Sequence, residues 1–130
     1  MDSPFLELPE SSWVACNALA FAVRDRYPVS PGHSLVITRR IVPTWFEASL
    51  EEQQAVFELV AEVKRILDGE FHPDGYNVGF NAGEFAGQTV MHLHVHVIPR
   101  FRGDVADPSG GIRHVIPALG NWQTLRSRKP

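Results

Sequence analysis

The sequence predicts an α+β domain in which a mostly antiparallel sheet of about five strands packs against one long helix. Short apolar segments bounded by Pro, Gly and Asp indicate strands, and a single long segment repeats apolar residues at helical spacing. Strand segments on both sides of the helix favour an α+β arrangement. At 130 residues, with 44% hydrophobic and 21% charged residues, the chain is expected to form one compact domain.

Strands are predicted on both sides of that helix. Residues 17–25 form a first strand, and a second begins at His33 after the turn-rich segment "DRYPVSPG", so the two are expected to pair antiparallel. Residues 76–83 form a short strand that leads into a glycine-spaced loop. Residues 89–98 alternate apolar and polar side chains, which predicts a longer strand.

The helix is predicted over residues 50–67. Ser49 and Glu52 have the spacing of a capping box, in which each side chain bonds the other residue's backbone N–H, and Gly69 indicates the end. The apolar face consists of Val56, Leu59, Val60, Val63, Ile66 and Leu67.

The segment after Arg100 is rich in Gly, Pro and Asp, which predicts an ordered excursion or loop, and the tail "RSRKP" is expected to fray. The chain is thus interpreted as a single domain, residues 1–130. Its core spans about residues 17–102, and residues 103–130 form a C-terminal extension.

Charge, cysteine content and hydropathy argue against several classes of function and location. A net charge of -3 and a pI near 6.0 argue against nucleic-acid binding, which usually needs a basic surface. Cys16 is the only cysteine, so neither an internal disulfide nor a CxxC zinc site can form. No apolar run is long enough to cross a bilayer and no signal core is visible at the N-terminus. We expect a cytoplasmic protein without nucleic-acid or membrane partners.

The segment "MHLHVHVIPR" places His92, His94 and His96 at alternate positions, so on a strand all three imidazoles would share one face. Three interpretations are open. The face could be exposed and tolerate histidine, or the imidazoles could share a metal ion, although no nearby Cys, Asp or Glu completes such a site. In the third, a neutral imidazole attacks an electrophile while its neighbours orient it.

The upstream loop "GEFAGQT" favours the third interpretation. It brings Gly83, Gly87, Gln88 and Thr89 to the start of the histidine strand. Backbone N–H groups, an amide and a hydroxyl suit a phosphate oxyanion.

These residues carry a resemblance to a known family. The segment "GQTVMHLHVHVIPR" resembles the signature of the histidine triad (HIT) superfamily, and "AFAVRDRYPVSPGHSLVI" resembles its first two strands. The segment "GDVADPSGGIRHVIP" is similar to a C-terminal extension of bacterial members. The resemblance implies a HIT-like α+β fold, a homodimer, and hydrolase or transferase activity at the α-phosphate of nucleotides.

The resemblance also implies roles for individual residues. His94 would be the nucleophile that forms a nucleotidyl-histidine intermediate, and His96 would contact the phosphate and assist departure of the leaving group. His92 and His33 would belong to the supporting hydrogen-bond network, and Asp25 would bind the ribose hydroxyls. The positions expected to contact phosphate are Asn81, Gly87, Gln88 and Thr89. A shallow apolar cleft from the first two strands, lined for example by Phe21, would hold the base.

Departures from the family pattern refine the expected activity. The zinc-binding cysteine pair of some relatives is absent and Ile41 stands where many have histidine, so no metal site is expected. Histidine at position 96, where a transferase branch has glutamine, favours hydrolysis. We therefore expect a hydrolase of dinucleoside polyphosphates or nucleoside phosphoramidates, with no required cofactor and magnesium only as a companion of the substrate. The alternatives are a nucleotide-binding sensor or scaffold with slow turnover, and a metal-binding module.

Overall fold

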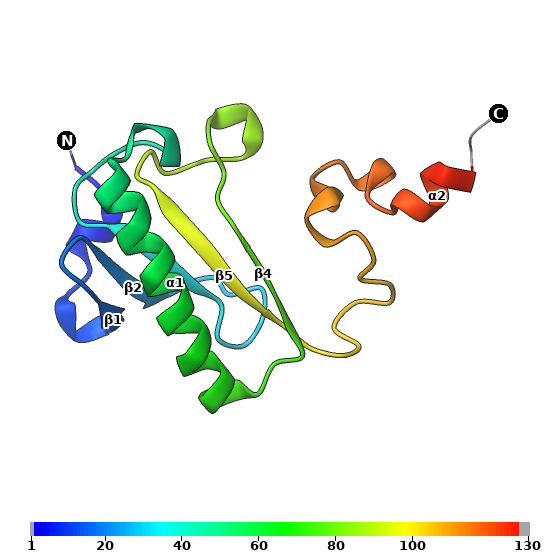
Figure 1. Cartoon of the computed structure of the whole chain (residues 1–130), viewed down its shortest axis with the longest axis horizontal. Helices are drawn as coiled ribbons and strands as arrows, with labels where there is room; N and C mark the ends of the chain where they lie inside the picture. Colours follow the sequence, from blue (N-terminus) through cyan, green and yellow to red (C-terminus); the bar gives the residue numbers. More distant parts are fainter. Residues whose placement is uncertain (1, 128–130) are drawn as a thin grey trace. The chain divides into compact units, whose positions relative to one another are not determined.

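The computed structural model describes residues 2–127, which divide into two units after Arg100. The first unit contains a five-stranded sheet and one long helix (Figure 1). These elements are β1 (Trp13–Cys16), β2 (Ala20–Arg24), β3 (Ser34–Thr38), α1 (Leu50–Phe71), β4 (Gly75–Gly79) and β5 (His94–Arg100). All neighbouring strands pair antiparallel in the order β1-β2-β3-β5-β4, which confirms the predicted α+β class.

The helix α1 begins at the predicted residue and ends later than predicted. The Ser49 hydroxyl accepts from the Glu52 N–H and the Glu52 carboxylate accepts from the Ser49 N–H, so the capping box is present. Gly69 does not end the helix, which continues to Phe71 and is capped by His72 in the left-handed conformation, with φ of 52°. The extra turn lets Phe71 pack against the core, which offsets the roughly 1 kcal/mol cost of a helical glycine.

Helix α1 covers one face of the sheet (Figure 1). Its buried apolar side chains are Val56, Leu59, Val63 and Leu67. They join a cluster with the sheet residues Ala20, Ala22, Val36, Val95 and Val97 and with Leu93, which precedes β5. Side chains along a strand alternate between the two faces of the sheet. The strand residues that lie between these buried ones therefore point to the face opposite α1.

The opposite face is covered by the N-terminal segment. Phe21, Val23, Leu35 and Ile37 form a second apolar cluster, and Phe5 and Trp13 pack against it. Trp13 belongs to β1, a strand that the sequence analysis did not identify, and its ring stacks on Phe21 with centroids 4.6 Å apart.

Two strand boundaries differ from the predictions. Strand β4 ends at Gly79, so residues 80–83 already belong to the loop. Strand β5 begins at His94 rather than at residue 89. The N–H of Leu93, just before it, donates to the carbonyl of Val42 in the segment that follows β3, at 2.7 Å. Of the three alternating histidines, His92 therefore lies outside the strand.

The second unit contains short helices where an excursion or loop was predicted. They are η5 (Gly111–Val115), η6 (Pro117–Leu119) and α2 (Trp122–Ser127). The Arg113 guanidinium donates to the carbonyls of Leu119 and Gly120, which holds η5 and η6 together. Residues 128–130, part of the tail expected to fray, lie outside the described residues. No helix within residues 2–127 is long and apolar enough to cross a membrane.

Candidate active site

Four histidines meet on the sheet face opposite α1. His94 and His96 project from β5 beside Ile37 and Leu35 of β3, their register partners. His33 immediately precedes β3, and its ring lies 5.2 Å from that of His96. His92 lies just before β5 and is completely buried. The fold thus brings together the four histidines predicted for the site.

The contact of His94 fixes which ring nitrogen carries its proton. Its Nδ1 lies 2.7 Å from the carbonyl oxygen of His92. Because a carbonyl can only accept, Nδ1 donates, and in the neutral ring Nε2 keeps a lone pair. This arrangement suits a nucleophile.

The ring of His92 is held at both nitrogens. Its Nε2 lies 2.7 Å from the carbonyl of Thr38 and must donate, so Nδ1 accepts a hydrogen bond from the Ser3 hydroxyl at 2.6 Å. Burial lowers the pKa of His92 below its usual value. A neutral ring with both nitrogens engaged supports its neighbours and has no free atom for chemistry.

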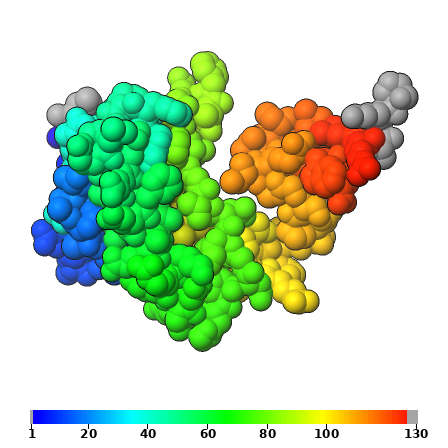
Figure 2. All heavy atoms as spheres, in the orientation of Figure 1, coloured from blue at the N-terminus to red at the C-terminus, as the bar shows by residue number. Residues whose placement is uncertain are grey.

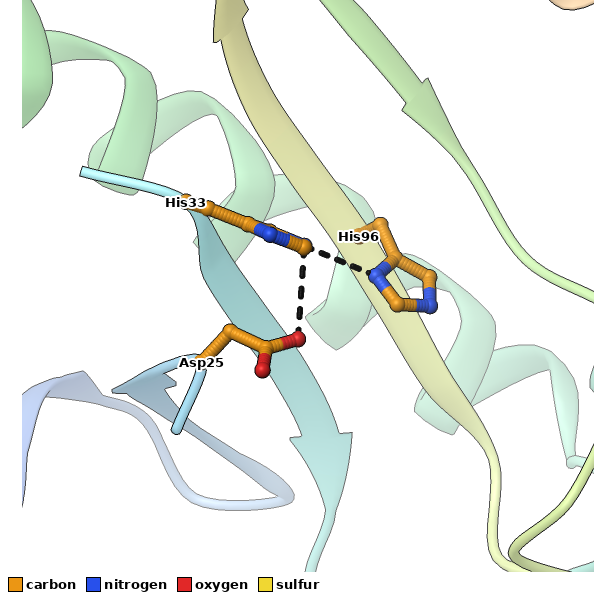
Figure 3. A group of neighbouring side chains, drawn as sticks. All are labelled: Asp25, His33 and His96. Atoms are coloured by element: carbon orange, nitrogen blue, oxygen red, sulfur yellow. Dashed lines mark hydrogen bonds and ion pairs between the residues drawn. The ribbon is translucent and has the colours of Figure 1, made fainter. Parts of the chain in front are cut away.

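Asp25, His33 and His96 form a connected group beside His94 (Figure 3). The Val29 N–H donates to Nδ1 of His33 at 3.1 Å, so the proton of the neutral His33 ring is on Nε2 and is donated to Nδ1 of His96 at 2.9 Å. The Asp25 carboxylate lies 3.4 Å from the same Nε2. Neutral His96 consequently carries its proton on Nε2, where it can donate to a ligand.

Burial also determines the charge of this group. It lowers the pKa of His96 to about 4, with smaller contributions from His94 and His33, while Asp25 opposes the shift. The pKa of His33 is lowered by burial and raised by Asp25, with burial the larger effect. Both rings are thus neutral at pH 7, as required for the hydrogen bond between their nitrogens.

A pocket of about 510 Å³ opens beside these histidines. Its apolar wall is formed by Pro4, Phe5, Leu8, Val23, Leu35 and Val90. Its polar wall is formed by Arg24, Asp25, Arg26, Tyr27, Asn81, Gly87, Thr89, His94 and His96. This size, and the combination of an apolar wall with convergent polar groups, are typical of sites that bind a small molecule.

The loop residues predicted to contact phosphate occupy different positions. Asn81, Gly87 and Thr89 line the pocket, and the side chains of Asn81 and Thr89 bond no other group within residues 2–127. Gln88 is only 3% exposed and does not line the pocket. Its amide nitrogen donates to the carbonyls of Pro43 and Val90, and its oxygen accepts from the Gly83 N–H. The structure therefore places Gln88 behind the pocket, where it fixes the shape of the loop.

The apolar wall differs from the expectation. Phe21, a predicted lining residue, is 1% exposed beneath Trp13 and does not reach the pocket, whereas Val23 and Leu35 do. Sequence reasoning also missed Phe5, whose ring lies 4.9 Å from that of His94 in an edge-on contact. The sequence "SPF" indicates only a helix N-terminus capped by Ser3. Nothing local predicts that this segment lies against residues far along the chain, although Ser3 and its partner His92 are 89 positions apart.

The chain matches proteins of one known family. A sequence model of the HIT domain family matches residues 9–103. The chain is 36% identical to an AP-4-A phosphorylase of Mycobacterium tuberculosis over 78% of its own length and 55% of that protein. It is 39% identical to an asymmetrical bis(5'-nucleosyl)-tetraphosphatase of Schizosaccharomyces pombe, over 79% and 57% of the two chains. The chain thus spans somewhat more than half the length of these curated relatives.

A solved structure agrees with these matches. The Hit-like protein of Bartonella henselae, described as involved in cell-cycle regulation, superposes with a TM-score of 0.70 at 32% identity. The superposition covers 76% of this chain and 75% of that one. The family match, the identities and the shared fold agree with the geometry of the four histidines, and the chain belongs to the HIT domain family.

Proposed function

We propose that the chain hydrolyses nucleotides at the α-phosphorus, with dinucleoside polyphosphates or nucleoside phosphoramidates as substrates. The observation that carries the proposal is the contact between Nδ1 of His94 and the His92 carbonyl, which leaves the Nε2 lone pair available in a pocket with free polar groups. The names of the relatives, an AP-4-A phosphorylase and a tetraphosphatase, favour dinucleoside polyphosphates.

The pocket walls support a binding mode. The apolar wall with Phe5, Val23 and Leu35 suits the base, and the Asp25 carboxylate can accept hydrogen bonds from the two ribose hydroxyls. Thr89 lies with Asn81 on the polar wall and suits the phosphoryl oxygens.

Hydrolysis would proceed in two steps, formation of a nucleotidyl-histidine intermediate and its hydrolysis by water. Nε2 of His94 bonds to the α-phosphorus as the bond to the leaving oxygen or nitrogen breaks, and the leaving group takes the electron pair. A phosphoramidate nitrogen also takes up a proton from solvent. The Nε2–H of His96 donates a hydrogen bond to the oxygens that gain charge in this step. Water then attacks the same phosphorus and gives up a proton to solvent, the electrons of the nitrogen–phosphorus bond return to Nε2 of His94, and a nucleoside monophosphate leaves.

Product analysis tests this function. Diadenosine tetraphosphate in ¹⁸O-labelled water is expected to give ATP and AMP, with the label on AMP, over many turnovers. Adenosine phosphoramidate assayed in parallel identifies the preferred leaving group. Formation of ADP in place of AMP when inorganic phosphate is added would contradict hydrolysis. A burst of one nucleotide per active site without further turnover would instead indicate a nucleotide-binding sensor or scaffold.

Activity is expected to survive exhaustive chelation of transition metals. Within residues 2–127, one group of side chains could hold a metal ion. It consists of Asp25, His33 and His96, whose possible ligand atoms lie within 4.8 Å of one another. However, the two ring nitrogens that face each other at 2.9 Å share a proton, which an ion would have to displace. A zinc enzyme treated alongside serves as the control for complete chelation. If zinc copurifies stoichiometrically and alone restores lost hydrolysis, the metal-site interpretation is correct.

We propose that the chain forms a homodimer through α1 and the edge strand β4. Among the described residues, β4 pairs only with β5, so its other edge is available to a second copy. An apolar groove of about 270 Å³ lies between the two elements and is lined by Trp45, Val56, Phe57, Val60, Val78, Gly79, Phe80 and Val95. Figure 2 shows α1 on the surface of the first unit. Phe57, which belongs to α1, is 66% exposed.

Light scattering at micromolar concentration is expected to give about twice the single-chain mass of 14.5 kDa. Phe57→Glu should shift the mass toward the monomer, because a carboxylate would be buried in an apolar contact. Phe85→Glu is the matched control, since Phe85 is fully exposed on η4 (Glu84–Ala86) outside the groove. A wild-type mass near that of one chain, unchanged on concentration, would rule out the dimer.

A further inference from the structure

The N-terminal strap, defined here as residues 2–8, is tied to the histidines through Ser3. The Ser3 side chain caps η1 (Pro4–Glu7) by accepting from the Phe5 N–H at 3.3 Å, and its oxygen lies 2.6 Å from Nδ1 of His92. Ser3 is 3% exposed and His92 is completely buried, so water does not compete for this bond. The strap thus joins the site through a buried hydrogen bond as well as through packing.

The direction of that hydrogen bond is fixed. Nε2 of His92 donates to the Thr38 carbonyl, so Nδ1 of the neutral ring has only a lone pair and the Ser3 hydroxyl must donate to it. The hydroxyl oxygen in turn accepts from Phe5. The ring of His92 is therefore held between the strap on one side and the residue that ends β3 on the other.

The His92 backbone connects this bond to the reacting group. Its carbonyl accepts the Nδ1–H of His94 at 2.7 Å, which is the contact that leaves the Nε2 lone pair free. With both ring nitrogens engaged, the His92 side chain cannot turn without breaking a buried hydrogen bond. The peptide plane that carries its carbonyl is also held by the Leu93 N–H, which donates to the Val42 carbonyl, so the side chain and the backbone of His92 are anchored together. From the same strap, the ring of Phe5 contacts His94 edge-on, with an interplanar angle of 61°.

We propose that Ser3 is a positioning residue for the nucleophile: through His92 it holds the carbonyl that orients His94. Ser3 does not line the pocket, whereas its neighbours Pro4 and Phe5 do, so the hydroxyl acts through His92 and not through substrate. The identification of His94 as nucleophile rests on the proposed function. The hydrogen bonds that join Ser3, His92 and His94 do not depend on that function.

Ser3→Ala is expected to lower kcat roughly 10- to 100-fold, as misorientation of a reacting group does, while KM and the affinity for AMP stay within about threefold. The matched control is Ser12→Ala, which removes an exposed hydroxyl that donates to the Pro9 carbonyl in the same part of the chain, and it should match wild type. If Ser3→Ala fails to fold, Ser3→Cys keeps the size and a weaker donor and should show a smaller loss confined to kcat. A folded variant with wild-type kcat, or with equal losses in kcat and nucleotide affinity, would overturn the proposal.

Imidazole ¹⁵N NMR tests the positioning role of Ser3 independently of the proposed hydrolase function, because the measurement needs no substrate. Wild type should show one proton on Nε2 of His92 and one on Nδ1 of His94. In Ser3→Ala, the His94 signals should shift toward an average of both tautomers. An unchanged His94 spectrum would refute the positioning role. A changed spectrum in a protein that cleaves neither substrate would refute the proposed function alone.

Discussion

Replacement of His94 by alanine is expected to lower kcat by at least ~10⁴-fold, equivalent to about 5.4 kcal/mol of transition-state stabilisation. The imidazole would supply a covalent bond to phosphorus, and none of the other three rings in the site offers a free Nε2 lone pair. His92 is engaged at both nitrogens, and His96 carries its proton on Nε2. Affinity for AMP, measured by calorimetry, should stay within a few fold because the pocket walls remain.

Two measurements make this result specific. Rapidly quenched wild-type enzyme should gain the mass of one nucleotidyl group, and the His94→Ala variant should gain none. His72→Asn is the control, since it removes an exposed histidine outside the site and asparagine tolerates the left-handed conformation found there. Retention of more than about a tenth of wild-type activity, after exclusion of contaminating hydrolases, would exclude His94 as the nucleophile.

The histidine alternation correctly predicted that His94 and His96 share a face, and it misplaced the third ring. Period-two spacing gives the face of each side chain once a strand exists, and His94 and His96 do share a face. It does not reveal where the strand begins. The chain before β5 bonds Val42, outside β3, and His92 is buried there as a support. The start of β5 thus depends on a partner distant in sequence.

Helix α1 shows the same limit at its two ends. Its start is encoded by Ser49 and Glu52, which are three residues apart and complete the capping box locally. Its end depends on packing, because the helix continues through Gly69 to bring Phe71 against the core. Local signals therefore predicted the first residue, and the tertiary contact decided the last.

The site residues that sequence reasoning missed or misplaced depend on contacts across the fold. Ser3 and Phe5 reach the histidines from the far end of the chain. Trp13 covers Phe21 and so excludes it from the pocket. Gln88 faces the loop backbone because Gly83 and Pro43 offer it partners there. Residue types predicted a phosphate site, but the fold decides which of these residues face the pocket.

Gly32→Ala is expected to destabilise the fold by about 2–6 kcal/mol. Gly32 has φ of +87°, in the turn whose hydrogen bond runs from the His33 N–H to the Ser30 carbonyl, and a side chain there costs roughly 1–3 kcal/mol in backbone strain. A Cβ would also lie 2.8 Å from Leu67 and 2.9 Å from Phe71 of α1, and such overpacking adds about 1–3 kcal/mol. Urea denaturation measures the loss as a lower midpoint at unchanged slope.

The matched control is the same substitution at Gly69, with the opposite sign expected. Gly69 lies within α1 and a Cβ there meets nothing within 4 Å, so Gly69→Ala should stabilise by roughly 0.5–1 kcal/mol through helix propensity. A loss below about 1 kcal/mol for Gly32→Ala would mean that the turn relaxes freely. Because His33 follows Gly32 directly and donates to His96, such a relaxed turn should still shift the ring pair and lower kcat. If instead the turn keeps its shape in Gly32→Ala, the variant should lose free energy of unfolding and keep the wild-type kcat.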